Sequence, residues 1–281
     1  MNMTNTTRRQ IAVGDGRFVV GGERRNLYGG AVHYWRLDRD KWSSILDSVK
    51  SMGFNMISIY MPWEIHEVAK GEFDFSGNKD IDAFMTLCEE KGLAIVARPG
   101  PQINSELTWF GYPKRILENE RLHARNAKGG RTVLTQVPKP IPALNYAADE
   151  FFEETALWYD AICAILAKHA YPNGGLVAAQ VDNEMAYFFC INAYAADFSE
   201  ASLQNYRTFL LGKYGSLEAV KAAHRIDVAS LEEIDPPRRF SADAAEQVPQ
   251  YADWIEYRET YLIDSMERLA SMMRERGLDQ I

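Results

Sequence analysis

Amphipathic segments alternate with short apolar runs over much of this chain. Three segments have apolar side chains at helical spacing, and each precedes an apolar run short enough for a buried strand. Gly53 and Gly92 follow the first two helices, at the left-handed cap position that favours glycine. This alternation predicts βαβ units and a parallel sheet. The predicted pairs are helix 42–52 with strand 54–60, helix 80–91 with strand 93–97, and helix 151–170 with strand 176–181.

The two ends of the chain complete this pattern. Residues 11–20, around Gly14-Asp15-Gly16, predict a small β-hairpin before a first strand at 26–32. Further helices are predicted at 202–213, 217–223 and 251–276, and residues 278–281 begin another apolar segment. We therefore predict an α/β fold that is the N-terminal portion of a TIM (β/α)8 barrel, with four βα units and the start of a fifth strand. The predicted division is a tail and hairpin at 1–25 and the barrel at 26–281.

Composition excludes several classes of function. The chain has 281 residues and a net charge of −8 without a dense basic cluster, which disfavours nucleic-acid binding. No apolar run approaches the roughly 20 residues of a membrane span. The polar N-terminus, MNMTNTTRRQ, does not resemble a signal peptide. The scattered cysteines Cys88, Cys163 and Cys190 favour buried free thiols over disulfides. We expect a cytoplasmic protein.

The run LVAAQVDNE, residues 176–184, carries the main indication of function. It predicts a buried strand that ends in Asp182, Asn183 and Glu184. In a parallel barrel the reacting side chains lie at the C-terminal ends of the strands. An amide beside a carboxyl group there can bind a sugar hydroxyl and protonate a glycosidic oxygen. The alternative is that Asn183 and Glu184 only cap the next helix.

Other predicted strand ends also carry polar or aromatic side chains. Tyr60 precedes Met-Pro-Trp-Glu-Ile-His-Glu, which suits a rigid loop beside a site, and a packing role for Tyr60 or Trp63 is an equal alternative. His66 has no second histidine at metal-ligand spacing, so a buried, hydrogen-bonded imidazole is favoured over zinc. Arg98 is interpreted as a structural salt-bridge residue. Glu106, in the following loop, is a candidate for binding sugar hydroxyls.

These strand ends together resemble one enzyme family. The segments YGGAVHYWRLDRDKW, SMGFNMISIYMPWEIHEVAKGEFDFSG, GLAIVARPGPQINSE and VAAQVDNE are similar to successive blocks of glycoside hydrolase family 35 β-galactosidases. The resemblance covers roughly residues 26–187, and the HE-x(3)-G-x-F-D-F-S-G and RPGP motifs carry it. It implies a retaining β-galactosidase with Glu184 as acid/base. It also places Tyr60, Ser105, Glu106 and Asn183 at sugar-binding positions. Residues 209–277 look more like the clan-related family 42.

Two departures from the family pattern affect this interpretation. The family usually reads RPGPYICAEW, whereas Gln102, Asn104, Ser105 and Leu107 stand here in place of Tyr, Cys, Ala and Trp. Glu64 stands where Asn is usual. This more polar loop puts strict galactose specificity in question.

The second departure is the missing nucleophile. A retaining enzyme needs a second carboxylate about 5 to 5.5 Å from the first, and the family places it beyond residue 281. The glutamates after residue 250 lie on a predicted helix and are not substitutes. They are Glu256, Glu259, Glu267 and Glu275.

We therefore predict a glycosidase that cleaves terminal β-D-galactosides without metal or cofactor and is inactive as this chain alone. Its partner is a small or oligosaccharide β-galactoside, not nucleic acid or membrane, and the oligomeric state of the full-length protein is left open. One alternative is a β-glycosidase of other specificity, such as a glucosidase, mannosidase or endo-glycanase. The other is a non-catalytic carbohydrate-binding remnant.

Overall fold

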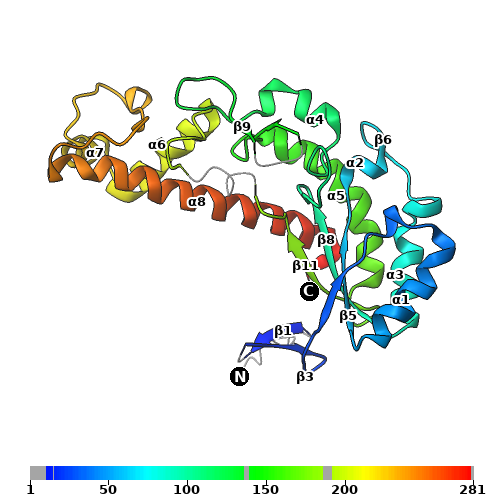
Figure 1. Cartoon of the computed structure of the whole chain (residues 1–281). Helices are drawn as coiled ribbons and strands as arrows, with labels where there is room; N and C mark the ends of the chain where they lie inside the picture. Colours follow the sequence, from blue (N-terminus) through cyan, green and yellow to red (C-terminus); the bar gives the residue numbers. More distant parts are fainter. Residues whose placement is uncertain (1–10, 15, 136–138, 186–191, 280–281) are drawn as a thin grey trace.

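A computed structural model describes residues 11–14, 16–135, 139–185 and 192–279. Its centre is a parallel sheet of four strands in the order β11-β8-β5-β4. The strands are β4 (Gly29–Ala31), β5 (Met56–Tyr60), β8 (Ala94–Gly100) and β11 (Leu176–Val181). Helices α1 (Trp42–Ser51), α3 (Ile81–Glu90) and α5 (Asp149–His169) connect them on one side of the sheet (Figure 1). The predicted α/β fold with a parallel sheet is confirmed.

Several strand boundaries differ from the prediction, and two of these differences arise because pairing, not composition, sets the boundary. β8 continues past Ala97 to Gly100, since Arg98 still pairs with Tyr60 and Gly100 with Val181. Pro99 and Gly100 had suggested an earlier end. β4 begins only at Gly29. A Cβ atom at that position would lie 2.1 Å from the Met56 carbonyl oxygen, so the close approach of the two strands requires glycine.

A small antiparallel sheet covers the N-terminal ends of two barrel strands. It contains the predicted hairpin, β1 (Ile11–Gly14) and β2 (Arg17–Val20), and a third strand that was not predicted, β3 (Glu23–Arg25). Ile11 and Val20 form a buried cluster with Val177, and Ala94 packs against it. The sheet therefore lies at the end of the barrel opposite the C-terminal strand ends.

A helical arm projects from the barrel (Figure 1). It contains α6 (Glu200–Tyr214), α7 (Leu217–His224) and α8 (Val248–Met273), and the end of α8 continues into a π-helical segment at Arg274–Leu278. The predicted strand start is wrong at Leu278, which belongs to this segment and is buried. Gly277, the predicted cap, has a non-helical backbone with φ of 92° within this segment, so the helix kinks there and no strand has begun by Leu278. Residues 280–281 lie outside the described residues.

The remaining elements are short and lie in the connections between the longer strands and helices. They are α2 (Trp63–His66), α4 (Lys114–Glu118), β6 (Glu67–Ala69), β7 (Glu72–Phe73), β9 (Val133–Leu134), β10 (Ile141–Pro142), and 3-10 turns at Tyr34–Arg36, Arg39–Lys41, Gly77–Lys79, Glu120–Leu122, Leu231–Glu233 and Ala245–Gln247.

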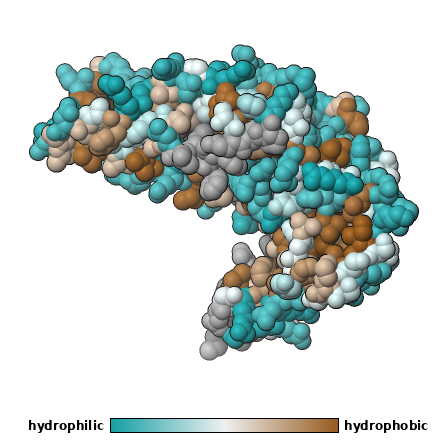
Figure 2. Space-filling model, in the orientation of Figure 1, coloured by the Kyte–Doolittle hydropathy of each residue, from teal (hydrophilic) through white to brown (hydrophobic). Residues whose placement is uncertain are grey.

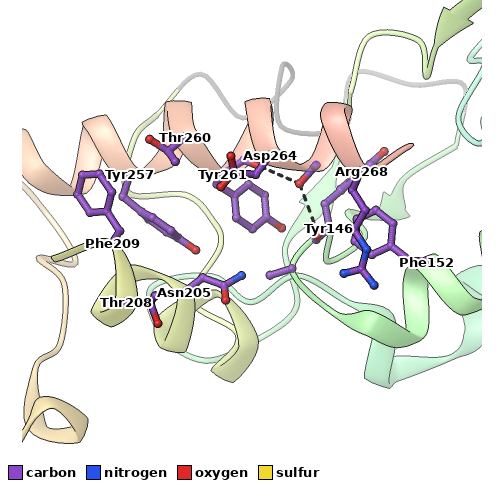
Figure 3. A pocket seen from close by; sticks show the side chains of 12 residues that line it. Tyr146, Phe152, Asn205, Thr208, Phe209, Tyr257, Thr260, Tyr261, Asp264 and Arg268 are labelled. Carbon is purple, nitrogen blue, oxygen red and sulfur yellow. Dashed lines mark hydrogen bonds between the residues drawn. The ribbon is translucent and has the colours of Figure 1, made fainter. Parts of the chain in front are cut away.

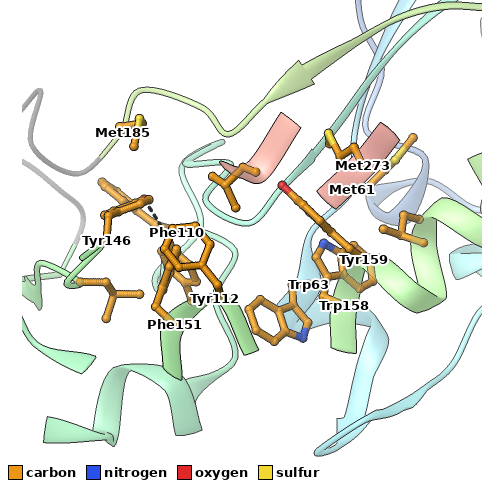
Figure 4. Close-up of a cluster of buried hydrophobic side chains, with 14 of the residues drawn as sticks. Met61, Trp63, Phe110, Tyr112, Tyr146, Phe151, Trp158, Tyr159, Met185 and Met273 are labelled. Atoms are coloured by element: carbon orange, nitrogen blue, oxygen red, sulfur yellow. Dashed lines mark hydrogen bonds between the residues drawn. The ribbon is translucent and has the colours of Figure 1, made fainter. Parts of the chain in front are cut away.

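An aromatic core joins α5 to the end of β8 (Figure 4). The Trp63 and Trp158 rings are stacked, with centroids 6.5 Å apart. Trp158 donates a hydrogen bond to the Pro99 carbonyl at 2.7 Å, and Tyr159 donates to the Gly100 carbonyl at 2.6 Å. Buried aromatic side chains with satisfied polar atoms fix their neighbours firmly. The loop that follows β8 therefore starts from a rigid base.

The cysteine prediction is confirmed for the two cysteines among the described residues. Cys88 and Cys163 are buried free thiols, and burial raises the pKa of each to about 12. Cys190 lies outside the described residues. None of the helices that the structure describes combines the length and apolar character needed to cross a bilayer.

Both outer strands of the sheet have free edges. Apart from one bridge between Ala170 and Leu176, no described residue pairs with the outer edge of β4 or β11. On α8, the side chains of Ile255, Ile263 and Met266 are exposed. Figure 2 shows hydrophobic surface at several places on the face of the molecule that it presents. Unpaired edges and exposed apolar faces favour association.

We expect the isolated 281-residue chain to aggregate or to unfold without cooperativity for this reason. Light scattering and a thermal melt followed by circular dichroism measure both properties. A soluble monomer with a sharp transition would contradict this expectation.

Candidate active site

Residues that are distant in sequence meet where the four parallel strands end. His33 follows β4, Tyr60 ends β5, the loop 101–113 follows β8, and Glu184 follows β11. Parallel strands bring their C-terminal ends to one edge of the sheet, which is where barrels place their chemistry. The contacts below join these four ends into one site.

Glu184 lies in the open part of this site. Its side chain is exposed, and Asn104 Nδ2 donates a hydrogen bond to its Oε2 at 2.8 Å. The backbone of Glu184 has φ of 46°, which is uncommon for a residue other than glycine. The alternative of a helix cap concerns residues 186–191, which lie outside the described residues; the first described helix after Glu184 begins at Glu200, with Ser199 as its cap. Glu184 is therefore an accessible carboxyl group at a strand end.

Asn183 is directed into the protein. It is 6% exposed, and its Nδ2 donates to the Ile103 carbonyl at 3.2 Å. Its Oδ1 accepts from Gln180 Nε2 at 3.2 Å. Both the NH2 group and the carbonyl oxygen of the Asn183 amide therefore have hydrogen-bond partners within the chain. To bind a sugar, the amide would have to give up one of these hydrogen bonds.

Tyr60 forms a compact group with His33 and Arg98. The Arg98 guanidinium lies 4.5 Å from the Tyr60 ring centroid and donates a hydrogen bond to its hydroxyl. The His33 and Tyr60 ring centroids are 5.3 Å apart. The predicted salt bridge of Arg98 is not found, since the carboxylates of the described residues make no ion pair with it. Instead of forming a salt bridge, the Arg98 guanidinium stacks on the Tyr60 ring.

Ser105 and Glu106 approach the same group from the loop after β8. Arg36 donates to the Ser105 carbonyl at 2.8 Å, and the Ser105 hydroxyl lies 3.4 Å from His33 Nε2. Burial and then the charge of Arg36 lower the pKa of His33, while the charge of Glu106 raises it. The structure therefore brings Tyr60, Ser105 and Glu106 together around His33.

Asp182 connects the site to the core and was not assigned a role from sequence. It is 1% exposed, and it accepts hydrogen bonds from Tyr146 at 2.8 Å and from the Gln102 backbone at 2.7 Å. Tyr146 and Tyr112 share a further bond at 2.9 Å (Figure 4). Burial raises the pKa of the Asp182 carboxyl to about 7, although these donors lower it. The partners lie 36 and 80 residues away, so no local pattern could have indicated them.

His66 and Glu64 belong to the wall behind the site. His66 is fully buried, bonded to the Tyr34 hydroxyl at 2.6 Å and to the Asp74 carbonyl at 3.0 Å, which confirms the hydrogen-bonded imidazole. Burial lowers its pKa to about 4. Burial raises the pKa of Glu64 to about 7, and a backbone bond from Gly111 lowers it.

A separate cavity of about 320 Å³ lies between α6 and α8 (Figure 3). Its walls include Phe209, Tyr257 and Tyr261, together with Asp264 and Arg268. None of the strand-end residues described above lines it. The candidate active site is therefore the strand-end group and not this cavity.

Several known proteins resemble this chain in sequence. Residues 17–136 match the model of "Glycosyl hydrolases family 35". An exo-beta-D-glucosaminidase of Pyrococcus horikoshii is 28% identical over 274 residues, which are 93% of this chain and 34% of that protein. The human beta-galactosidase-1-like protein 2 is 33% identical over 159 residues, which are 56% of this chain and 22% of that protein. The chain thus spans about a third or less of these relatives' lengths.

Solved structures share the fold. The polyextremophilic beta-galactosidase of the Antarctic haloarchaeon Halorubrum lacusprofundi superposes with a TM-score of 0.70 at 18% identity, over 89% of this chain and 35% of that one. Residues 17–136 of this chain are therefore similar to glycoside hydrolase family 35, and the chain has the fold of part of a TIM barrel.

Proposed function

We propose that the protein carrying this chain is a retaining glycoside hydrolase that cleaves terminal β-D-galactosides, with Glu184 as its acid/base. One observation carries the proposal: an exposed carboxyl group follows β11 and is hydrogen-bonded across the site by Asn104. A strand-end carboxyl group that is open to solvent yet fixed by a neighbour suits proton transfer to a bound glycoside.

The reaction would proceed in two steps. In the first, the Glu184 carboxyl group gives its proton to the glycosidic oxygen as that bond breaks, while a carboxylate from outside this chain attacks the anomeric carbon. In the second, the Glu184 carboxylate takes a proton from water, which displaces the enzyme carboxylate from the sugar. The first step leaves Glu184 ionised and the second restores its proton. No cofactor is required.

Tyr60, Ser105, Glu106 and Asn183 would bind the sugar. The first three surround His33 at the strand ends, so hydroxyl groups of one sugar ring could reach them together. Asn183 would contribute once its bond to Ile103 is exchanged. The human relative is named as a beta-galactosidase-like protein and the haloarchaeal structure is that of a beta-galactosidase, so both support a galactoside as substrate.

A different sugar specificity is the second candidate. The relative named as an exo-beta-D-glucosaminidase aligns with 93% of this chain, whereas the human galactosidase-like protein aligns with 56%. The Asn104 amide also reaches Glu184 in a loop that departs from the family 35 pattern. Both observations favour testing sugars other than galactose.

Rates with a panel of aryl glycosides distinguish these candidates. We expect kcat/KM of the intact protein to be highest for 4-nitrophenyl β-D-galactoside among the β-galactoside, β-glucoside, β-mannoside and β-glucosaminide. A clear preference for one of the other three sugars would support the second candidate. Binding of galactose without hydrolysis of any of the four would instead indicate a non-catalytic carbohydrate-binding protein.

We also propose the domain division at residue 25 and a cytoplasmic location. The first is supported by the N-terminal sheet β1-β2-β3, which ends at Arg25 and, among the described residues, pairs with no strand of the barrel sheet. The second is supported by the free thiols of Cys88 and Cys163.

A further inference from the structure

Gln102 forms hydrogen bonds with the backbone of the loop that carries the candidate acid/base, Glu184. Its side chain is fully buried, and its Nε2 donates to two successive carbonyl oxygens, those of Asn183 at 2.8 Å and Glu184 at 2.5 Å. Its backbone N–H donates to Asp182 Oδ1 at 2.7 Å. One residue of the loop after β8 therefore contacts three successive residues after β11.

The contacts also run in the opposite direction. Asn183 Nδ2 donates to the Ile103 carbonyl at 3.2 Å, and the Asp182 N–H donates to the Gly100 carbonyl at 3.2 Å. The two loops thus form a reciprocal set of hydrogen bonds, which we name the Gln102–Asp182 clasp. Asp182 is in turn held by Tyr146, which anchors the clasp to the core.

The backbone in these loops needs such support. Asp182 and Glu184 have φ of 54° and 46°, and Asn104, Ser105 and Glu106 have φ between 52° and 55°. Left-handed backbone is unfavourable for residues other than glycine or asparagine and persists only where the surroundings hold it. The clasp supplies hydrogen bonds that a relaxed loop would lose.

We propose that Gln102 and Asp182 are positioning residues that aim the Glu184 carboxyl group at the leaving-group oxygen. The inference rests on the proposed role of Glu184. Neither residue reaches the substrate, since both are buried behind the loop. Their effect passes through the peptide groups of residues 182–184, whose orientation sets the direction of the Glu184 side chain.

The variant Gln102→Met tests the clasp with little change of shape. Methionine is unbranched and of similar length, and it keeps the backbone N–H that Asp182 accepts. Only the two bonds from Nε2 are removed. Tyr159→Phe is the matched control, because it also removes a buried hydrogen bond, the one to the Gly100 carbonyl, while that carbonyl keeps its bond from the Asp182 N–H and both Gln102 Nε2 bonds remain.

The decisive readout is how kcat/KM depends on the leaving group. A misplaced acid weakens protonation, which phenol needs and 2,4-dinitrophenol does not. We expect Gln102→Met to lower kcat/KM for phenyl β-galactoside by about 10- to 100-fold, with little change for the 2,4-dinitrophenyl substrate. Tyr159→Phe should affect both substrates equally. An equal loss for both substrates with Gln102→Met would overturn the proposal, because it would show only general damage.

Hydrogen exchange in the segment 177–185 gives a second, activity-free measurement. Exchange there should be faster in Gln102→Met than in wild type or Tyr159→Phe, and unchanged exchange would overturn the clasp. If wild type hydrolyses none of the aryl glycosides, the proposed function fails, and exchange alone then decides whether the clasp exists. If Gln102→Met does not fold, Gln102→Leu replaces it. That variant also lacks a donor for the two carbonyls, keeps the backbone N–H and should give the same exchange result.

Discussion

Replacing Glu184 by glutamine is expected to lower hydrolysis of β-galactosides with poor leaving groups by about 10²- to 10⁴-fold in the intact protein. The amide has the same shape and can still accept the hydrogen bond from Asn104, but it cannot give up or take a proton. Both steps of the reaction therefore lose their proton transfer. Initial rates with phenyl β-galactoside measure the effect.

Azide separates this cause from a loss of folding. Azide attacks the glycosyl-enzyme without needing a base, so it should restore turnover of 2,4-dinitrophenyl β-galactoside in the Glu184→Gln variant and form the β-galactosyl azide. Glu118→Gln, on the surface of α4 and paired with Lys114, is the control and should keep the wild-type rate. Wild-type rates in Glu184→Gln would exclude Glu184 as the acid/base.

Asp182 is expected to make the protein less stable as the pH rises from 5 to 8. Burial raises the pKa of this carboxyl from its usual 3.8 to about 7. A raised folded-state pKa means that the folded state prefers the protonated form. That contribution to stability is complete below about pH 4 and is lost as the pH rises through 7. Between pH 5 and pH 8 it amounts to about 3 kcal/mol.

The variant Asp182→Asn should remove this dependence. The introduced amide can accept from the Gln102 N–H and donate to the Tyr146 oxygen, while Tyr146 donates to Tyr112, so the network is kept without a charge. Melting temperatures of the intact protein at pH 5 and pH 8 measure the effect. Relative to Asp182→Asn, wild type should lose several degrees at the higher pH.

The fully exposed Asp227, changed to asparagine, is the control and should follow wild type at both pH values. Equal pH dependence in wild type and Asp182→Asn would contradict a buried, titrating Asp182.

The sheet could be predicted because its signals are local. Strand 176–181 was placed to the residue, since an apolar run between Gly175 and Asp182 has clear limits. The continuation of β8 through Pro99 could not be predicted, because it depends on pairing with two neighbouring strands. The three-stranded N-terminal sheet was only partly predicted for a related reason: all three residues of β3, Glu-Arg-Arg, are exposed, so this strand has no apolar pattern.

The candidate site could also be predicted only where its signals are local in sequence. The position of Glu184 after a strand follows from the sequence, and the structure agrees with it. Its contact with Asn104 spans 80 positions, and so does the contact between Gln102 and Asp182. Such contacts depend on how two loops face each other, which no periodicity reveals. The family resemblance indicated where a sugar would bind but not how the loops are held.

The left-handed backbone after β8 limits how the sugar preference of this protein could be engineered. Asn104, Ser105 and Glu106 all have positive φ, and β-branched residues such as valine, isoleucine and threonine are poorly compatible with that conformation. A combinatorial library at these positions is therefore best restricted to glycine, asparagine, aspartate and other tolerant residues. Many other variants would not adopt this backbone conformation, whatever their effect on sugar binding. Their loss of activity would therefore give no information about sugar recognition.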